Sequence, residues 1–221
     1  MKRITGIIKT IALAALIAAL TLAGAAQAAG GAEKPKYIFL FIGDGMGEAQ
    51  VHAANLYSRA SGEGEFAFPL LPVRGKITTS TAKGAVTDSA AAGTALASGY
   101  KTENGILNMD PSGAKRFVTV AMAARDRGMR VGIVTSSFMN DSTPAAFYAF
   151  TPSRLNLYEI GEQLADSGFH YFGGGGLSRR KGKNGDQKDL YEIAAAGGYK
   201  VLRTSKDIMS ASPGNKVLAS G

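Results

Sequence analysis

The sequence contains no cysteine among its 221 residues and only two histidines, His52 and His170. Without cysteine the chain can form neither a disulfide nor a thiolate metal site. Any metal bound by these residues must therefore be held mostly by carboxylate and hydroxyl oxygens, unless ligands come from outside the chain. Both histidines are expected in structural or exposed positions.

Long apolar runs and basic clusters are also scarce. Beyond the first 28 residues we find no apolar run of the roughly 20 residues that span a bilayer. The formal net charge is +8, and Lys2, Arg3 and Lys9 contribute to it. An excess of this kind favours anionic ligands in general or reflects a solvated surface. Because no basic run is interleaved with aromatic residues, we expect no nucleic-acid partner.

The first 28 residues have the pattern of a secretory signal peptide. A basic start is followed by an apolar run from Ile11 to Ala23, and Ala26-Gln27-Ala28 gives small residues at the cleavage position. An uncleaved anchor is the alternative, although the run is short for a full span. We therefore expect an exported protein, periplasmic or secreted, with no stable membrane anchor after cleavage. Residues 29–36 are predicted to be a linker before one domain, 37–221.

Apolar stretches of strand length alternate with helical stretches along this domain. Tyr37–Ile42 suits a strand buried on both faces, Val73–Ser80 alternates enough to be a strand, and Arg130–Ser136 is a second clear buried strand. Shorter strands are expected at 169–172, 199–202 and 217–220, and helices at 48–59, 89–98, 117–127, 145–150, 157–167, 190–196 and 205–210. This order predicts an α/β fold with a mostly parallel central sheet and helices on both faces.

The stretch Val86–Thr94 carries the most specific chemistry. Asp88 and Ser89 run into small residues that favour a helix, so Ser89 should lie in its first turn. There the free backbone N–H groups and the helix dipole favour an anion. A serine hydroxyl at this place could attack a phosphoryl group. The alternative is that Asp88 or Ser89 simply caps the helix.

Other oxygen-bearing side chains follow the predicted strands. Asp44 comes after the first strand, and Asp141 and Thr143 come after the strand Arg130–Ser136. If these strands are parallel neighbours, the loops share one edge of the sheet with Ser89. Carboxylates and hydroxyls suit a divalent cation, which would lower the pKa of the serine hydroxyl. Metal activation is favoured because no histidine lies in these loops to act as a base.

Simpler readings of these residues stay open. Asp44 could cap a turn, and Asp141 lies in a sequence that also suits a turn. Arg154 could be a surface residue, or its guanidinium could bind two phosphate oxygens at once.

Three blocks of the sequence, in order, resemble the alkaline phosphatases. Phe39–Gly47 looks like the first metal-binding turn of that family, and Thr87–Thr94 matches its nucleophile signature closely. Asp141–Ala146, with Arg154 thirteen residues after Asp141, matches the next block in order and spacing.

The resemblance implies an alkaline-phosphatase-like fold and the hydrolysis of small phosphate monoesters, commonly by a homodimer. Ser89 would be the nucleophile that becomes phosphoserine, Arg154 would clamp the phosphate, and Asp88 would orient Arg154. The family's cofactors are zinc and magnesium. Asp44 would bridge the two metals, Asp141 and Thr143 would serve the magnesium site, and Ser89 would contribute an oxygen at the metals.

The resemblance covers only the first half of the family's length. The later half normally supplies an acidic magnesium ligand and the aspartates and histidines that hold two zinc ions, and those positions do not occur here. We therefore expect a truncated, amino-terminal portion of such a phosphatase, ending at Gly221. The alternatives are a catalytically inactive α/β module that binds phosphate or magnesium weakly, and a related phosphodiesterase.

Overall fold

The computed structural model describes residues 35–211 and 214–221. The chain divides into two units, Met1–Gly43 and Asp44–Gly221. The predicted signal peptide and most of the predicted linker lie outside the described residues. Within the part that is described, no helix combines the length and hydropathy needed to cross a membrane.

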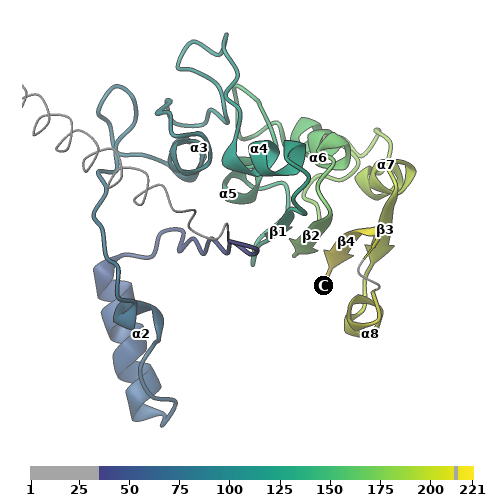
Figure 1. The fold of residues 1–221 in the computed structure, drawn as a ribbon. Coiled ribbons are helices and arrows are strands. Elements are labelled where there is room, and N and C mark those ends of the chain that lie inside the picture. Colours follow the sequence, from purple (N-terminus) through teal and green to yellow (C-terminus); the bar gives the residue numbers. More distant parts are fainter. Residues whose placement is uncertain (1–34, 212–213) are drawn as a thin grey trace, which may run out of the picture. The chain divides into compact units, whose positions relative to one another are not determined.

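A parallel sheet forms the centre of the second unit (Figure 1). Its strands are β1 (Gly132–Val134), β2 (Tyr171–Gly174), β3 (Tyr199–Leu202) and β4 (Lys216–Ser220). They are ordered β1-β2-β4-β3, and all three pairings are parallel. Ile133 lies opposite Phe172, and Phe172 lies opposite Leu218. The predicted parallel α/β architecture is thereby confirmed.

Helices connect these strands, and most begin at a residue whose side chain caps them. The helices are α2 (Glu48–Ala60), α3 (Ser89–Ser98), α4 (Val120–Asp126), α5 (Ser142–Ala145), α6 (Leu157–Asp166), α7 (Leu190–Ala196) and α8 (Ser205–Met209), with a 3-10 turn at Phe68–Leu70. Side chains that accept a hydrogen bond from a first-turn N–H are those of Asp88, Thr119, Asp141, Asp189 and Thr204. Such caps satisfy donors that the first turn of a helix leaves free.

Alternate side chains along the strands pack on opposite faces of the sheet. Phe172 and Leu218 are fully buried in the main core, which includes Ile160 of α6. Val217 points to the other face and packs in a smaller cluster with Ile208 of α8. Figure 1 shows α8 on the opposite side of the strands from α6 and α7. Helices therefore cover both faces, as the sequence predicts.

The two helices α3 and α5 pack unusually closely because α3 contains a glycine at their contact. A Cβ added at Gly93 would lie 2.8 Å from the Ala146 Cβ, closer than two side-chain carbons can approach. Ala90 and Ala91, both buried, complete a narrow helix face. The small residues that follow Ser89 therefore allow α3 to approach the Thr143 turn.

Two predicted strands are wrong. Tyr37–Ile42 and Val73–Ser80 have no regular secondary structure, and their apolar side chains are largely exposed, with Phe41 at 89% and Val73 at 87%. A strand exists only through hydrogen bonds to a neighbour, and neither stretch pairs with another among the described residues.

The predicted helix 145–150 is also misplaced. The structure begins this helix, α5, at Ser142 because Asp141 caps it, and it ends at Ala145. The following residues continue as a turn.

Candidate active site

Ser89 is the first residue of α3 and contacts Asp44 through its hydroxyl group. The Ser89 Oγ donates a hydrogen bond to Asp44 Oδ1 at 3.1 Å, and Thr143 Oγ1 donates to Asp44 Oδ2 at 2.6 Å. One carboxylate thus joins two hydroxyls from α3 and α5. The sequence predicts Asp44 at the end of a strand, whereas it lies in a turn just before α2.

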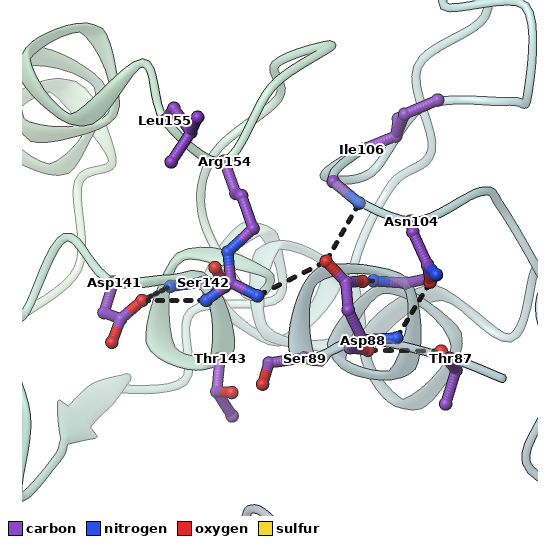
Figure 2. A network of polar contacts seen from close by, with 12 residues as sticks. Thr87, Asp88, Ser89, Asn104, Ile106, Asp141, Ser142, Thr143, Arg154 and Leu155 are labelled. Atoms are coloured by element: carbon purple, nitrogen blue, oxygen red, sulfur yellow. Dashed lines mark hydrogen bonds and ion pairs between the residues drawn. The ribbon is translucent and has the colours of Figure 1, made fainter.

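Arg154 lies between two aspartates that cap neighbouring helices (Figure 2). Its Nη1 is 3.3 Å from Asp88 Oδ2, and its Nη2 is 3.4 Å from Asp141 Oδ1. Its backbone N–H donates to the carbonyl of Gly105 at 2.7 Å. Figure 2 shows the Ser89 and Thr143 side chains side by side near the guanidinium. The residues predicted for the site are therefore brought together.

Asp141 has a pKa below its ordinary value. Burial alone would raise that pKa, but hydrogen bonds from the Ser142 N–H and the Ser137 hydroxyl and the charge of Arg154 outweigh it. The two bonds are short, 2.7 Å from Ser142 N and 2.9 Å from Ser137 Oγ. Asp141 is thus held in its ionised form at neutral pH.

The charge of the cluster suits a divalent cation. Three aspartates, Asp44, Asp88 and Asp141, and the single Arg154 give a formal sum of −3 + 1 = −2. The oxygens of Asp44, Asp141 and Thr143 are the donor type that magnesium prefers.

The same residues do not fit a zinc site. In the described part of the chain, no group of three His, Cys, Asp or Glu side chains converges to hold a metal ion, so neither zinc nor magnesium has a complete set of protein ligands here. His52 is exposed on α2, and the Nδ1 of His170 accepts a hydrogen bond from Val131 N at the start of β1. His52 is thus exposed, and His170 has a structural contact with the backbone before β1.

Two residues that contact the site, Asn104 and Gly105, are not among the residues predicted for it. Asp88 N donates to Asn104 Oδ1 at 2.8 Å, and Gly105 N donates to Asp88 Oδ2 at 3.0 Å. The Asn-Gly dipeptide is a turn signal that could have located this bend. Its contact with Asp88, which is 16 residues earlier in the chain, depends on the tertiary fold.

Known proteins resemble the chain in both sequence and structure. Streptomycin-6-phosphate phosphatase from Streptomyces griseus is 31% identical over 94% of this chain and 52% of its own length. The alkaline phosphatase of the Antarctic bacterium TAB5 matches with a TM-score of 0.75 at 27% identity, over 85% of this chain and 53% of that one. The Thermus thermophilus enzyme matches with a TM-score of 0.70 at 32% identity, over 81% and 38%.

The chain thus spans about half the length of the relatives it matches. A variant of the TAB5 enzyme is described with magnesium bound in its M3 site. The family model for alkaline phosphatase matches residues 35–219, nearly the whole of the predicted domain. On this match and the fold it shares with solved members, the chain belongs to the alkaline phosphatase family.

Proposed function

We propose that this chain carries the nucleophile of a metal-dependent phosphate monoester hydrolase that works through a phosphoserine at Ser89. The observation that carries the proposal is the position of the Ser89 hydroxyl, which begins α3 and donates to Asp44. Arg154, between Asp88 and Asp141, provides a cation beside it. Membership of the alkaline phosphatase family supports the same reaction class.

In the proposed reaction, a bond forms between Ser89 Oγ and phosphorus as the bond from phosphorus to the alcohol oxygen of the substrate breaks. The proton that leaves the Ser89 hydroxyl would reach the departing alcohol oxygen through solvent, while Asp44 Oδ1, 3.1 Å from Ser89 Oγ, orients the hydroxyl before the metal is bound. The first-turn N–H groups of α3 and the Arg154 guanidinium would bind the phosphoryl oxygens. Water then breaks the Ser89 Oγ–phosphorus bond, releasing phosphate and returning a proton to Oγ.

The formal charge of the cluster explains why this reaction needs a metal. A net −2 repels a phosphate dianion, so bound cations must offset it before substrate can enter. Asp44, Asp141 and Thr143 would hold magnesium, with Ser89 as a further oxygen. Bound metal would lower the pKa of the serine hydroxyl and polarise the phosphoryl oxygens. Zinc would depend on ligands beyond these residues.

Replacement of Ser89 by alanine tests the nucleophile. In the full-length, metal-loaded protein, Ser89→Ala should lower the rate of p-nitrophenyl phosphate hydrolysis by at least about a thousandfold. Ser205→Ala is a matched control, because Ser205 is also the first residue of a side-chain-capped helix, α8. Unchanged hydrolysis by Ser89→Ala would exclude the proposed mechanism, and a comparable loss in the control would make the effect unspecific.

Two further measurements separate the alternatives. Relative rates on a phosphate monoester and a diester distinguish the monoesterase from a related phosphodiesterase. Titration of zinc and magnesium into the 221-residue chain tests the inactive module, which predicts weak magnesium binding at most and no hydrolysis. Two tightly bound zinc ions together with turnover would exclude that module.

The proposed location and assembly rest on the sequence and on the family. We propose export, with cleavage after Ala28, and a homodimer that acts on small phosphate monoesters. Mass spectrometry of the mature amino terminus tests the cleavage, and sedimentation of the purified full-length protein tests the homodimer. A mature protein that still begins at Met1 would favour the uncleaved anchor.

A further inference from the structure

The side chain of Asn104 is bonded at both ends to the backbone that leads into α3. Its Oδ1 accepts from Asp88 N at 2.8 Å, and its Nδ2 donates to the Val86 carbonyl at 2.9 Å. The amide orientation is fixed by its partners, since one is a donor and the other an acceptor. Asn104 therefore fixes the backbone on both sides of Thr87, immediately before Ser89.

Gly105 extends this contact from the nucleophile turn to the arginine. Its N–H donates to Asp88 Oδ2 at 3.0 Å, and its carbonyl accepts from Arg154 N at 2.7 Å. Gly105 has a φ of +82°, which other residues adopt only with strain. Two consecutive residues thus contact the backbone of Asp88, its carboxylate and the backbone of Arg154.

The loop that carries these two residues is itself tied down on both sides. Glu103 Oε1 accepts from Lys83 N at 2.9 Å, and the Thr102 carbonyl accepts from Ala82 N at 3.0 Å. After the loop, Leu107 and Thr151 exchange two backbone hydrogen bonds of 2.9 and 3.1 Å. Because both ends of the loop are held by contacts other than those with Asp88, the loop can fix the position of the Asp88 backbone.

We propose that Asn104 and Gly105 are positioning residues that set the place of Ser89 relative to Arg154. The inference rests on the proposed function, in which these two side chains act on one phosphoryl group. Ser89 directly follows the residue that Asn104 holds, so rotation of the Val86–Asp88 backbone would displace its hydroxyl. A misplacement of about 1 Å can cost roughly a hundredfold in rate.

The two residues should affect different kinetic constants. Asn104 bonds only to the segment before Ser89, so Asn104→Ala should lower kcat about tenfold while KM changes less than about threefold. Gly105 also contacts Arg154, so Gly105→Ala should lower kcat and raise KM. The Cβ of an alanine at position 105 would meet no atom within 4 Å, so Gly105→Ala changes mainly the backbone strain. Gly185→Ala is the control for that strain, because Gly185 has a φ of +76° and the same free space.

The experiment measures kcat and KM for p-nitrophenyl phosphate and the hydrogen-exchange rate of the Asp88 amide in the full-length, metal-loaded protein. Asn104→Ala should speed exchange at Asp88, because the bond to Oδ1 is lost. Lys101→Ala is the loop control, since the one bond of its Nζ among the described residues goes to Ser80 Oγ, at 2.6 Å. Asn104→Asp keeps an acceptor for Asp88 N but places a carboxylate oxygen against the Val86 carbonyl, so its kcat should also fall about tenfold or more. If Asn104→Ala does not fold, Asn104→Asp carries the test.

The outcomes are distinguishable. Wild-type kcat in the Asn104 variants, or an equal loss in Lys101→Ala, would overturn the positioning role while Ser89→Ala remains inactive. Full activity of Ser89→Ala would instead overturn the proposed function. A kcat loss confined to Asn104 and Gly105 variants, with faster exchange of the Asp88 amide in Asn104→Ala, would support the positioning role of these two residues.

Discussion

Asp88 and Asp141 each stand at the amino-terminal cap of a short helix, and each contacts one arm of the Arg154 guanidinium. Their remaining contacts differ. Both oxygens of Asp88 accept from backbone groups, Oδ1 from Ala91 N and Oδ2 from Gly105 N. Oδ2 of Asp141 accepts instead from the Ser137 hydroxyl, a donor that can rotate away.

The difference in donors suits the two carboxylates to different proposed roles. The Asp88 side chain is 26% exposed and is held by the scaffold, so it can orient Arg154 but has little capacity for a ligand. The Asp141 side chain is 41% exposed and can turn an oxygen towards a metal when Ser137 releases it. Identical residues at equivalent helix positions thus serve the scaffold in one case and the proposed metal site in the other.

The largest expected effect comes from removing the residue that both aspartates share. Arg154→Ala should lower kcat/KM for p-nitrophenyl phosphate by about a hundredfold or more, because a cation aimed at the phosphoryl group is lost. Arg180→Ala is the control, since Arg180 also pairs with a capping aspartate, Asp189, at 3.3 Å. A similar loss in both variants would mean that the effect arises from any arginine–cap pair.

A smaller effect should separate the two aspartates by stability. Asp88→Ala removes acceptors for two backbone donors and should lower the free energy of unfolding by about 2 kcal/mol. Asp141→Ala removes one backbone acceptor and should cost about 1 kcal/mol. Urea unfolding of metal-free protein measures both values. The reverse order would contradict the assignment of Asp88 to the scaffold.

The smallest effect should appear in the pH dependence of stability. The pKa of Asp141 is lowered from the ordinary 3.8, so its ionised form adds to the stability of the folded protein above pH 3.8. This added stability is lost as the pH falls through the folded pKa. Ser137→Ala should raise the pKa of Asp141 and reduce this contribution, so wild type and variant should differ at neutral pH and converge as the pH falls below the folded pKa.

Acid unfolding of metal-free protein, followed from pH 7 to pH 2, measures this convergence. Ser210→Ala removes an exposed hydroxyl hydrogen bond of 2.9 Å that goes to the backbone carbonyl of Asp207 rather than to a carboxylate. That control should change the curve less. A constant difference between wild type and Ser137→Ala at every pH would contradict the role given to Asp141.

The bounds of α3 are predicted well because the signals that set them are local. Asp88 supplies the cap, small residues follow, and the observed α3 has the predicted bounds, Ser89–Ser98. The gathering of Ser89 with Asp141 and Arg154 was also expected, from an ordered set of motifs that resemble one family.

Features that depend on distant partners were not predictable from pattern alone. The apolar run Tyr37–Ile42 reads as a buried strand, but its composition cannot specify a hydrogen-bonding neighbour. Asn104 is similar, since the Asn-Gly pair indicates a turn but not that the side chain binds Val86 and Asp88. Sequence reasoning succeeded where contacts are close along the chain and failed where the fold supplies them.

The close packing at Gly93 has a consequence for how this protein can diversify. Any side chain there would meet Ala146, so neither α3 nor α5 can accept a larger residue at the contact without separating Ser89 from Thr143. The two helices are therefore held together at this contact. Side chains of the loops around it have more room, since Leu155 is 70% exposed directly after Arg154.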